Sequence, residues 1–196
     1  KIKNHFNDIE KYKSYFSNAA QKAKGEASVW YLYSQSAPQE IKSLAGDAKI
    51  IICLRNPVDM IYSLHGETIY NGYETESDFE KALTLEYGRK SGLNIPSSAT
   101  FVQCLLYKEN GLYSKHIQRW QEAFGKDNVL IILLDDLHKN ALDSTNKALE
   151  FLGLNELPEL NNEVQNEAKD FTSLGLHQKF KSAKNWEKNL IRLLIP

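Results

Sequence analysis

The chain has 196 residues, of which 42% are hydrophobic and 25% charged, and its formal net charge is −1. This length and composition are typical of one globular domain with a sizeable core, so we expect a single domain over residues 1–196. A charge this close to zero creates no global field that would recruit DNA or a membrane surface, and no apolar run approaches the ~20 residues that span a bilayer. We therefore expect no nucleic-acid partner and no membrane span.

The chain has two cysteines, Cys53 in an apolar run and Cys104 in a later segment, and they suggest neither a disulfide framework nor metal-ligand spacing. No cluster of His, Cys, Asp or Glu has metal-ligand spacing, so no metal is expected. A reducing, cytoplasmic setting follows as the default. Cys53 lies in an apolar run and is predicted to be a small core residue.

The predicted elements begin with a polar helix over 7–24 that ends at Gly25. An aromatic segment over 26–33 reads as a short strand or loop. The remaining predicted elements are, in order, a helix over 38–45, a strand over 50–54, helices over 57–70, 78–90 and 112–124, a strand over 128–134 and a helix over 144–152. Two apolar strands flanked by helices predict an α/β domain with a parallel sheet. Since two strands make no stable open sheet, further strands are expected, either short or outside this chain.

The most informative stretch is the junction between the strand at 50–54 and the helix that follows it. Arg55 stands at the carboxyl end of the strand, Asn56 suits an N-cap, and Pro57 suits the first helical position. Ser63 follows about two turns after Arg55. A fixed cation and a hydroxyl at the mouth of a strand–helix junction predict a site for a phosphate group.

The same stretch resembles the sulfotransferases that use 3'-phosphoadenosine 5'-phosphosulfate (PAPS) as donor. The match rests on the run Leu54-Arg55-Asn56-Pro57 and on Tyr62-Ser63, with Met60 where relatives often carry a second arginine. The resemblance implies that Arg55 and Ser63 hold the 3'-phosphate of the nucleotide. It also implies a P-loop-NTPase-like fold of three layers, with a parallel sheet flanked by helices.

Other segments extend the resemblance over roughly residues 25–155, in order and with family-like spacing. They are Gly25–Ser28, Trp30–Ser34, Gly72–Glu74, Asp78–Leu83, Gly111–Trp120, Asp135–Leu137 and Phe151–Leu154. One part of the family pattern has no counterpart, namely the loop Gly-x-x-Lys-x-Gly-Thr that grips the 5'-phosphosulfate. We therefore expect the N-terminal βαβ portion to be missing and this chain alone to bind the donor poorly. A late basic loop of the family corresponds to residues 166–173, where Lys169 would serve.

The remaining candidate residues each have an alternative. The resemblance makes His65 the catalytic base or a group that orients the acceptor, whereas the residue pattern slightly favours the alternative of a partly buried histidine satisfied by a backbone carbonyl. It makes Tyr113 and Trp30 substrate-binding aromatics, and Tyr113 serves core packing equally well. Arg55 in a capping salt bridge and Ser63 bonded back to its helix are the structural alternatives for that pair.

The function that the resemblance implies is transfer of a sulfuryl group from PAPS to a hydroxyl or amine, leaving 3'-phosphoadenosine 5'-phosphate (PAP). The acceptor is a small molecule, a lipid or a glycan, and its cleft is expected to be bordered by the Gly72 region and the loop over 91–100. A non-catalytic nucleotide-binding or scaffold module is the alternative. A nucleotide kinase is disfavoured, because no Gly-x-x-x-x-Gly-Lys loop is present.

Overall fold

The computed structural model describes residues 9–17, 20–21 and 23–160. Its elements are α1 (Ile9–Ser17), α2 (Ala37–Leu44), β1 (Ile50–Leu54), α3 (Pro57–Tyr70), α4 (Phe79–Lys90), η1 (Val102–Leu105), α5 (Tyr107–Gly111), α6 (Tyr113–Phe124), η2 (Lys126–Asn128), β2 (Val129–Leu133), α7 (Leu134–Lys139) and α8 (Ala141–Phe151). They fall into two compact units. Among the described residues, those within 9–54 and 114–160 form unit 1, and residues 55–113 form unit 2.

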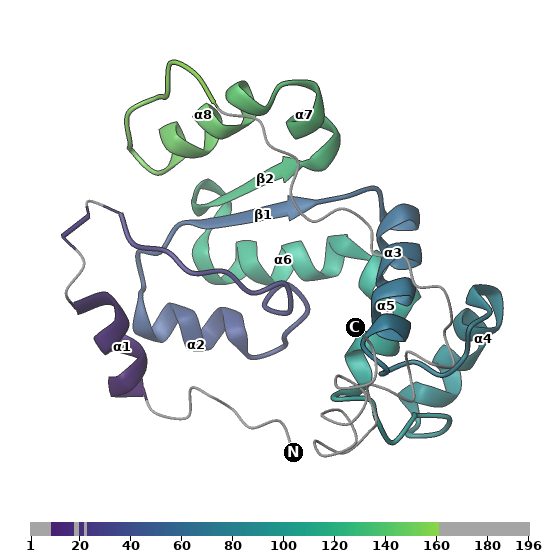
Figure 1. The fold of residues 1–196 in the computed structure, drawn as a ribbon. Coiled ribbons are helices and arrows are strands. Elements are labelled where there is room, and N and C mark those ends of the chain that lie inside the picture. The colour runs from purple at the N-terminus through teal and green to yellow at the C-terminus, as the bar shows by residue number, and fades with distance from the viewer. Residues whose placement is uncertain (1–8, 18–19, 22, 161–196) are drawn as a thin grey trace, which may run out of the picture. The chain divides into compact units, whose positions relative to one another are not determined.

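Unit 1 is built around the two predicted strands, which pair in parallel. The register runs from Ile50 opposite Val129 to Leu54 opposite Leu133. In Figure 1, α2 and α6 lie on one side of this strand pair, and α7 and α8 lie on the other. The parallel pairing and the flanking helices confirm the α/β prediction.

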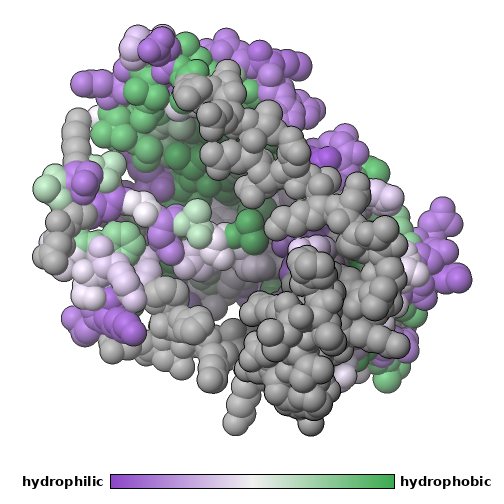
Figure 2. Space-filling view, viewed as in Figure 1, coloured by the Kyte–Doolittle hydropathy of each residue, from purple (hydrophilic) through white to green (hydrophobic). Residues whose placement is uncertain are grey.

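The strand pair leaves apolar side chains uncovered. Along β1 the side chains of Ile52 and Leu54 are buried, whereas Ile51 and Cys53 are exposed. The prediction that Cys53 is a core residue was therefore wrong, because side chains alternate along a strand and the described residues bury only the Ile52 and Leu54 side of β1. On β2, Ile131 and Leu133 are also exposed, and Figure 2 shows apolar surface in this region of unit 1.

Unit 2 carries α3, α4, η1 and α5. Helix α3 begins as predicted, since the Asn56 side chain accepts a hydrogen bond of 2.9 Å from the N–H of Val58. Asp78 caps α4 in the same way, through the N–H of Lys81. The short elements η1 and α5 were not predicted. Buried residues at this end of the unit are Ala82, Cys104, Leu105, Leu106 and Tyr107.

The main difference from the prediction lies at the N-terminal end. The helix predicted over 7–24 is observed only as Ile9–Ser17, and residues 20–21 and 23–25 are not helical. The segment predicted as a short strand or loop contains turns over residues 29–33. Within the described ranges, no helix has the length and hydropathy needed to cross a bilayer.

Candidate functional site

Arg55 is the first residue after β1 and the second before α3. Its side chain is exposed, and within the described residues its guanidinium has no hydrogen-bond or ion-pair partner. The alternative role in a capping salt bridge therefore has no acidic partner in this part of the chain. The cation stands at the N-terminal end of a capped helix, where a bound anion is also favoured by the helix dipole.

Ser63 lies six residues after Pro57, about 9 Å along the axis of α3. Exposed hydroxyls of other helices, such as those of Ser14, Ser43 and Thr84, donate to the carbonyl three residues earlier. Ser63 is exposed as well, yet its hydroxyl makes no such bond within the described residues. Its donor thus remains available, unlike that of a serine bonded back to its helix.

Tyr113 is brought to Arg55 by the packing of α5 against α3. Gly111 permits that approach, because a Cβ there would lie 3.3 Å from Cγ2 of Ile61. The Tyr113 hydroxyl donates a hydrogen bond of 3.1 Å to the backbone carbonyl of Arg55. Burial raises the pKa of this phenol, and the positive charge of Arg55 partly opposes the shift. The structure therefore places Tyr113 beside the predicted phosphate ligand.

His65 lies on α3 with only 4% of its surface exposed. Its Nε2 is 2.8 Å from the backbone carbonyl of Glu76, and because a carbonyl can only accept, Nε2 carries the hydrogen. The ring also packs against Phe79 and Tyr107, with centroids 5.4 and 5.5 Å away. This is the environment of a histidine that holds a neighbouring loop. Its role as catalytic base stays a prediction, one that only Nδ1 can fulfil in this tautomer.

Trp30, the fifth predicted site residue, belongs to unit 1, whereas the other four belong to unit 2. It is half-buried, and its ring contacts Tyr33 at a centroid distance of 5.6 Å. Arg119 steadies this segment, because Nη2 donates to the carbonyls of Leu32 and Tyr33 at 3.4 Å. An acceptor contact at Trp30 stays a prediction.

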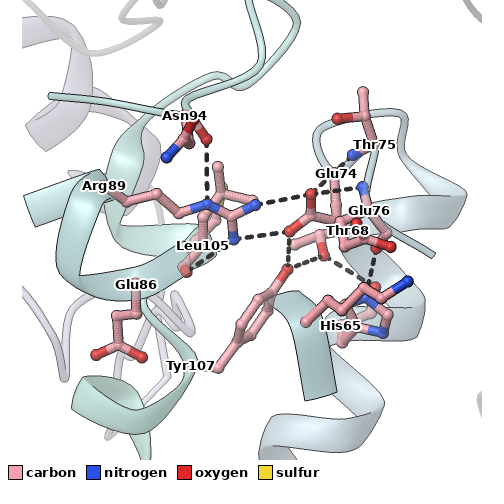
Figure 3. Close-up of polar contacts among 12 residues, drawn as sticks. His65, Thr68, Glu74, Thr75, Glu76, Glu86, Arg89, Asn94, Leu105 and Tyr107 are labelled. Atoms are coloured by element: carbon pink, nitrogen blue, oxygen red, sulfur yellow. Dashed lines mark hydrogen bonds and ion pairs between the residues drawn. The ribbon is translucent and has the colours of Figure 1, made fainter. Parts of the chain in front are cut away.

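A buried charged cluster in unit 2 was missed by the sequence analysis (Figure 3). Arg89 and Glu74 form a bidentate ion pair at 2.8 and 2.9 Å, with exposed fractions of 2% and 0%. Glu74 Oε1 also accepts the backbone N–H groups of Thr75 and Glu76, so the carboxylate holds the turn over 74–76. Burial acts to raise the pKa of the Glu74 carboxyl. The hydrogen bonds from Arg89, the Glu76 backbone and Tyr107 outweigh burial and hold this pKa below its usual value.

The cluster continues through two hydroxyl groups. The Tyr107 hydroxyl lies 2.9 Å from Glu74 Oε2 and 2.9 Å from Oγ1 of Thr68. Thr68 Oγ1 in turn donates to the carbonyl of His65 at 2.9 Å. Burial is the main cause of the raised pKa of Tyr107, which keeps the phenol protonated. The cluster therefore ties the start of α5 and the end of α4 to α3 near His65.

Two further sequence predictions concern a late basic loop and the expectation that the chain holds no metal. The late loop over 166–173, with Lys169, lies outside the described residues. Among the residues that the structure does describe, no group of three or more His, Cys, Asp or Glu side chains could hold a metal ion.

Curated relatives support the resemblance. Human bifunctional heparan sulfate N-deacetylase/N-sulfotransferase 3 is 30% identical over 167 residues, which cover 81% of this chain and 18% of that protein. Mouse heparan sulfate glucosamine 3-O-sulfotransferase 3B1 is 24% identical over 127 residues, covering 65% of this chain and 30% of that protein. The chain thus spans less than a third of the length of these curated relatives.

A solved structure and a family comparison agree. The crystal structure of a sulfotransferase from Alicyclobacillus acidocaldarius matches with a TM-score of 0.66 and 28% sequence identity, covering 80% of this chain and 62% of that one. This match confirms the predicted fold class. The family described as "Sulfotransferase domain" matches residues 4–189. The chain therefore belongs to the sulfotransferase family.

Proposed function

We propose that this chain takes part in transfer of a sulfuryl group from PAPS to a hydroxyl or amine of an acceptor, with Arg55 and Ser63 binding the 3'-phosphate of the nucleotide. The observation that carries the proposal is that the exposed side chains of Arg55 and Ser63 have no hydrogen-bond or ion-pair partner among the described residues, in a chain of the sulfotransferase family. The relatives named for heparan sulfate support a glycan among the acceptor classes expected from the sequence.

The hydrogen-bond donors of Arg55 and Ser63 fit a phosphate monoester. A guanidinium supplies up to two parallel N–H donors to phosphate oxygens, and a serine hydroxyl supplies a third donor. Arg55 precedes the Asn56-capped N-terminus of α3, whose dipole favours negative charge, and Ser63 lies about 9 Å further along the same helix. The Tyr113 hydroxyl holds the Arg55 backbone at its carbonyl, so it positions the side chain without using the guanidinium.

PAPS, when bound, supplies the activated sulfuryl group. In this proposal His65 accepts the proton of the acceptor at Nδ1, because Nε2 already donates to the carbonyl of Glu76. Trp30 contributes an aromatic surface for the acceptor. The family pattern supports both roles, and the hydrogen bond from Nε2 to Glu76 supports Nδ1 as the accepting atom.

The 5' end of the donor needs a further element in this proposal. Ile51 on β1 and the pair Ile131 and Leu133 on β2 are exposed, and two parallel strands alone are not a stable sheet. We propose that a further strand covers this apolar surface and carries the loop that grips the phosphosulfate. A cytoplasmic location stays part of the proposal, to be tested by fractionation of cells.

The test is calorimetric titration of the protein with PAP. Arg55→Ala should weaken binding about tenfold or more, because a charge-assisted hydrogen bond contributes about 1.5–3 kcal/mol. Lys81→Ala is the matched control, since Lys81 is an exposed cation on α4 in the same unit. Absence of PAP binding by the full-length protein, or equal affinity of its Arg55→Ala variant, would overturn the proposal.

Transfer of radiolabelled sulfate from PAPS separates an enzyme from a binding module. Labelled product with hydroxyl or amine acceptors supports the enzyme. PAP binding that depends on Arg55 but gives no labelled product on any acceptor supports the non-catalytic alternative.

A further inference from the structure

Unit 2 contains an open cavity of about 340 Å³ between the 74–76 turn and the loop that follows α4. Its polar lining comes from Thr75, Glu76, Arg89 and Asn94. Leu85, Ile95 and Pro96 form its apolar walls. The volume is at the lower end of the roughly 300–1,000 Å³ usual for small-molecule sites. The mix of apolar walls and a few polar groups is also typical of such sites.

Arg89 contributes an unused donor to this cavity. Four of the five N–H groups of its guanidinium are occupied, two by Glu74 and one each by the carbonyls of Leu105 and Asn94. The fifth, on Nη2, has no acceptor among the described residues. Because the guanidinium is planar, this N–H lies parallel to Nε–H, which points at Asn94 in the cavity wall. An N–H donor of a side chain that is 98% buried therefore faces the cavity side of the cluster.

Two further groups on the 74–76 turn are available. The Thr75 side chain is exposed and has no hydrogen bond within the described part of the chain. Glu76 uses Oε1 to accept the N–H of Asp78, which leaves Oε2 available. The backbone carbonyl of Glu76 is the group that binds His65 Nε2, so one residue joins the cavity to His65.

The charge of the lining selects against anions. The positive charge of Arg89 is neutralised by its ion pair with Glu74, and the carboxylate of Glu76 remains. A bound carboxylate or sulfate would therefore meet a net negative lining, and like charges a few Å apart repel even near a protein surface. A hydroxyl can instead accept from Arg89 and donate to Glu76.

We propose that this cavity binds an uncharged, hydroxyl-bearing group of monosaccharide size, and that it discriminates against the corresponding uronic acid. As a binding site, the cavity stands on its own lining. Its assignment as the subsite for part of the sulfuryl acceptor rests on the proposed function and on the link through Glu76 to His65.

Saturation-transfer NMR titration of the protein tests the binding. The probes are the methyl glycosides of glucose, galactose and mannose, and the methyl uronosides of glucose and galactose. At least one neutral glycoside should bind, and its uronoside should bind about tenfold more weakly. Glu76→Gln should narrow that difference, because the repelling charge is removed while an amide oxygen can still accept from Asp78.

Thr75→Phe fills the cavity and should abolish glycoside binding. Thr100→Phe is the matched control, since Thr100 is exposed in the same unit and does not line the cavity. Circular dichroism of both variants checks that they fold. The proposal is overturned if no neutral glycoside binds, if uronosides bind as well as their neutral counterparts, or if folded Thr75→Phe binds like the original protein.

Titration of the same samples with PAP keeps the two proposals distinguishable. Absence of glycoside binding by the unmodified protein, with intact PAP binding, counts against the cavity alone. Glycoside binding by the full-length protein without any PAP binding overturns the proposed function and leaves the cavity assignment in place.

Discussion

Unit 2 uses two arginines in opposite ways. Arg89 is 2% exposed, and four of its five N–H groups have partners from Glu74 and two backbone carbonyls. Arg55 is exposed, and its guanidinium has no partner within the described residues. The two side chains carry the same charge and belong to the same compact unit.

The difference follows from the surroundings of each guanidinium, which is buried at Arg89 and exposed at Arg55. A buried charge is tolerated only when it is paired and hydrogen-bonded, so Arg89 is committed to the fold. An exposed cation that follows a strand and precedes a capped helix keeps its donors for a ligand. Removal of Arg89 should therefore affect stability, whereas removal of Arg55 should affect binding.

The largest expected effect is that of Arg89→Ala. The change leaves the buried Glu74 carboxylate without its counter-charge, so the free energy of unfolding should fall by about 3–5 kcal/mol. Urea unfolding followed by circular dichroism measures it. Arg55→Ala should stay within about 0.5 kcal/mol of the original protein. Equal losses in the two variants would contradict the assignment of different roles.

Acid should reduce the contribution of the Arg89–Glu74 ion pair to the stability of the protein. Because hydrogen bonds from Arg89, the Glu76 backbone and Tyr107 outweigh burial and lower the pKa of folded Glu74, its contribution to stability is fully present above the unfolded pKa, about 4.3. That contribution is lost as the pH falls through the lowered folded pKa. Urea unfolding between pH 7 and pH 3 should show a smaller pH dependence for Glu74→Gln. Parallel curves for the two proteins would rule out Glu74 as a source of acid sensitivity.

Tyr107→Phe should have a smaller effect on the buried cluster. It removes the hydroxyl between Glu74 and Thr68, but Glu74 keeps its bonds to Arg89 and Thr68 keeps the carbonyl of His65. We expect a loss of about 1 kcal/mol in urea unfolding. Tyr87→Phe is the control, because Tyr87 is 86% exposed. A loss of 3 kcal/mol or more would mean that the hydroxyl matters as much as the ion pair.

On the Arg55 side the expected effect is on binding and not on stability. Ser63→Ala should reduce PAP affinity about tenfold through loss of one hydrogen bond to a charged group. The free energy of unfolding should stay unchanged, because the Ser63 hydroxyl has no partner within the described residues. Titration calorimetry measures the affinity, with Ser43→Ala as control. Unchanged affinity would remove Ser63 from the proposed phosphate site.

The strand–helix junction was predictable because its signals are local. Asn56 and Pro57 set the start of α3, and the apolar run sets β1, so both elements were predicted with the observed bounds. The placement of Tyr113 beside Arg55 was not predictable in this form. It depends on a contact between residues 58 positions apart, made through the close approach of α5 to α3.

The buried cluster gave no comparable signal. A glutamate two residues after a glycine and an arginine in the last turn of a helix are both usual at the surface, and their burial depends on each other. The five residues of α5 are too few for a helical period, and the helix is supported from outside by Glu86, which accepts the N–H groups of Lys108 and Glu109. Cys53 was misplaced because the covering of a strand face is a property of the assembled sheet.

The hydroxyl chain near His65 has a direction. Three contacts of 2.9 Å join Glu74, Tyr107, Thr68 and the carbonyl of His65, and the two hydroxyls supply only two hydrogens. While Glu74 is ionised it draws the Tyr107 hydrogen, so the Thr68 hydrogen is shared between the phenol oxygen and the His65 carbonyl. A proton on the Glu74 carboxyl supplies the third hydrogen. The carboxyl then donates to the Tyr107 oxygen, Tyr107 donates to Thr68, and Thr68 donates to the His65 carbonyl alone. The ionisation of buried Glu74 thus sets the direction of the hydrogen bond between Tyr107 and Thr68, which Glu74 reaches only through Tyr107.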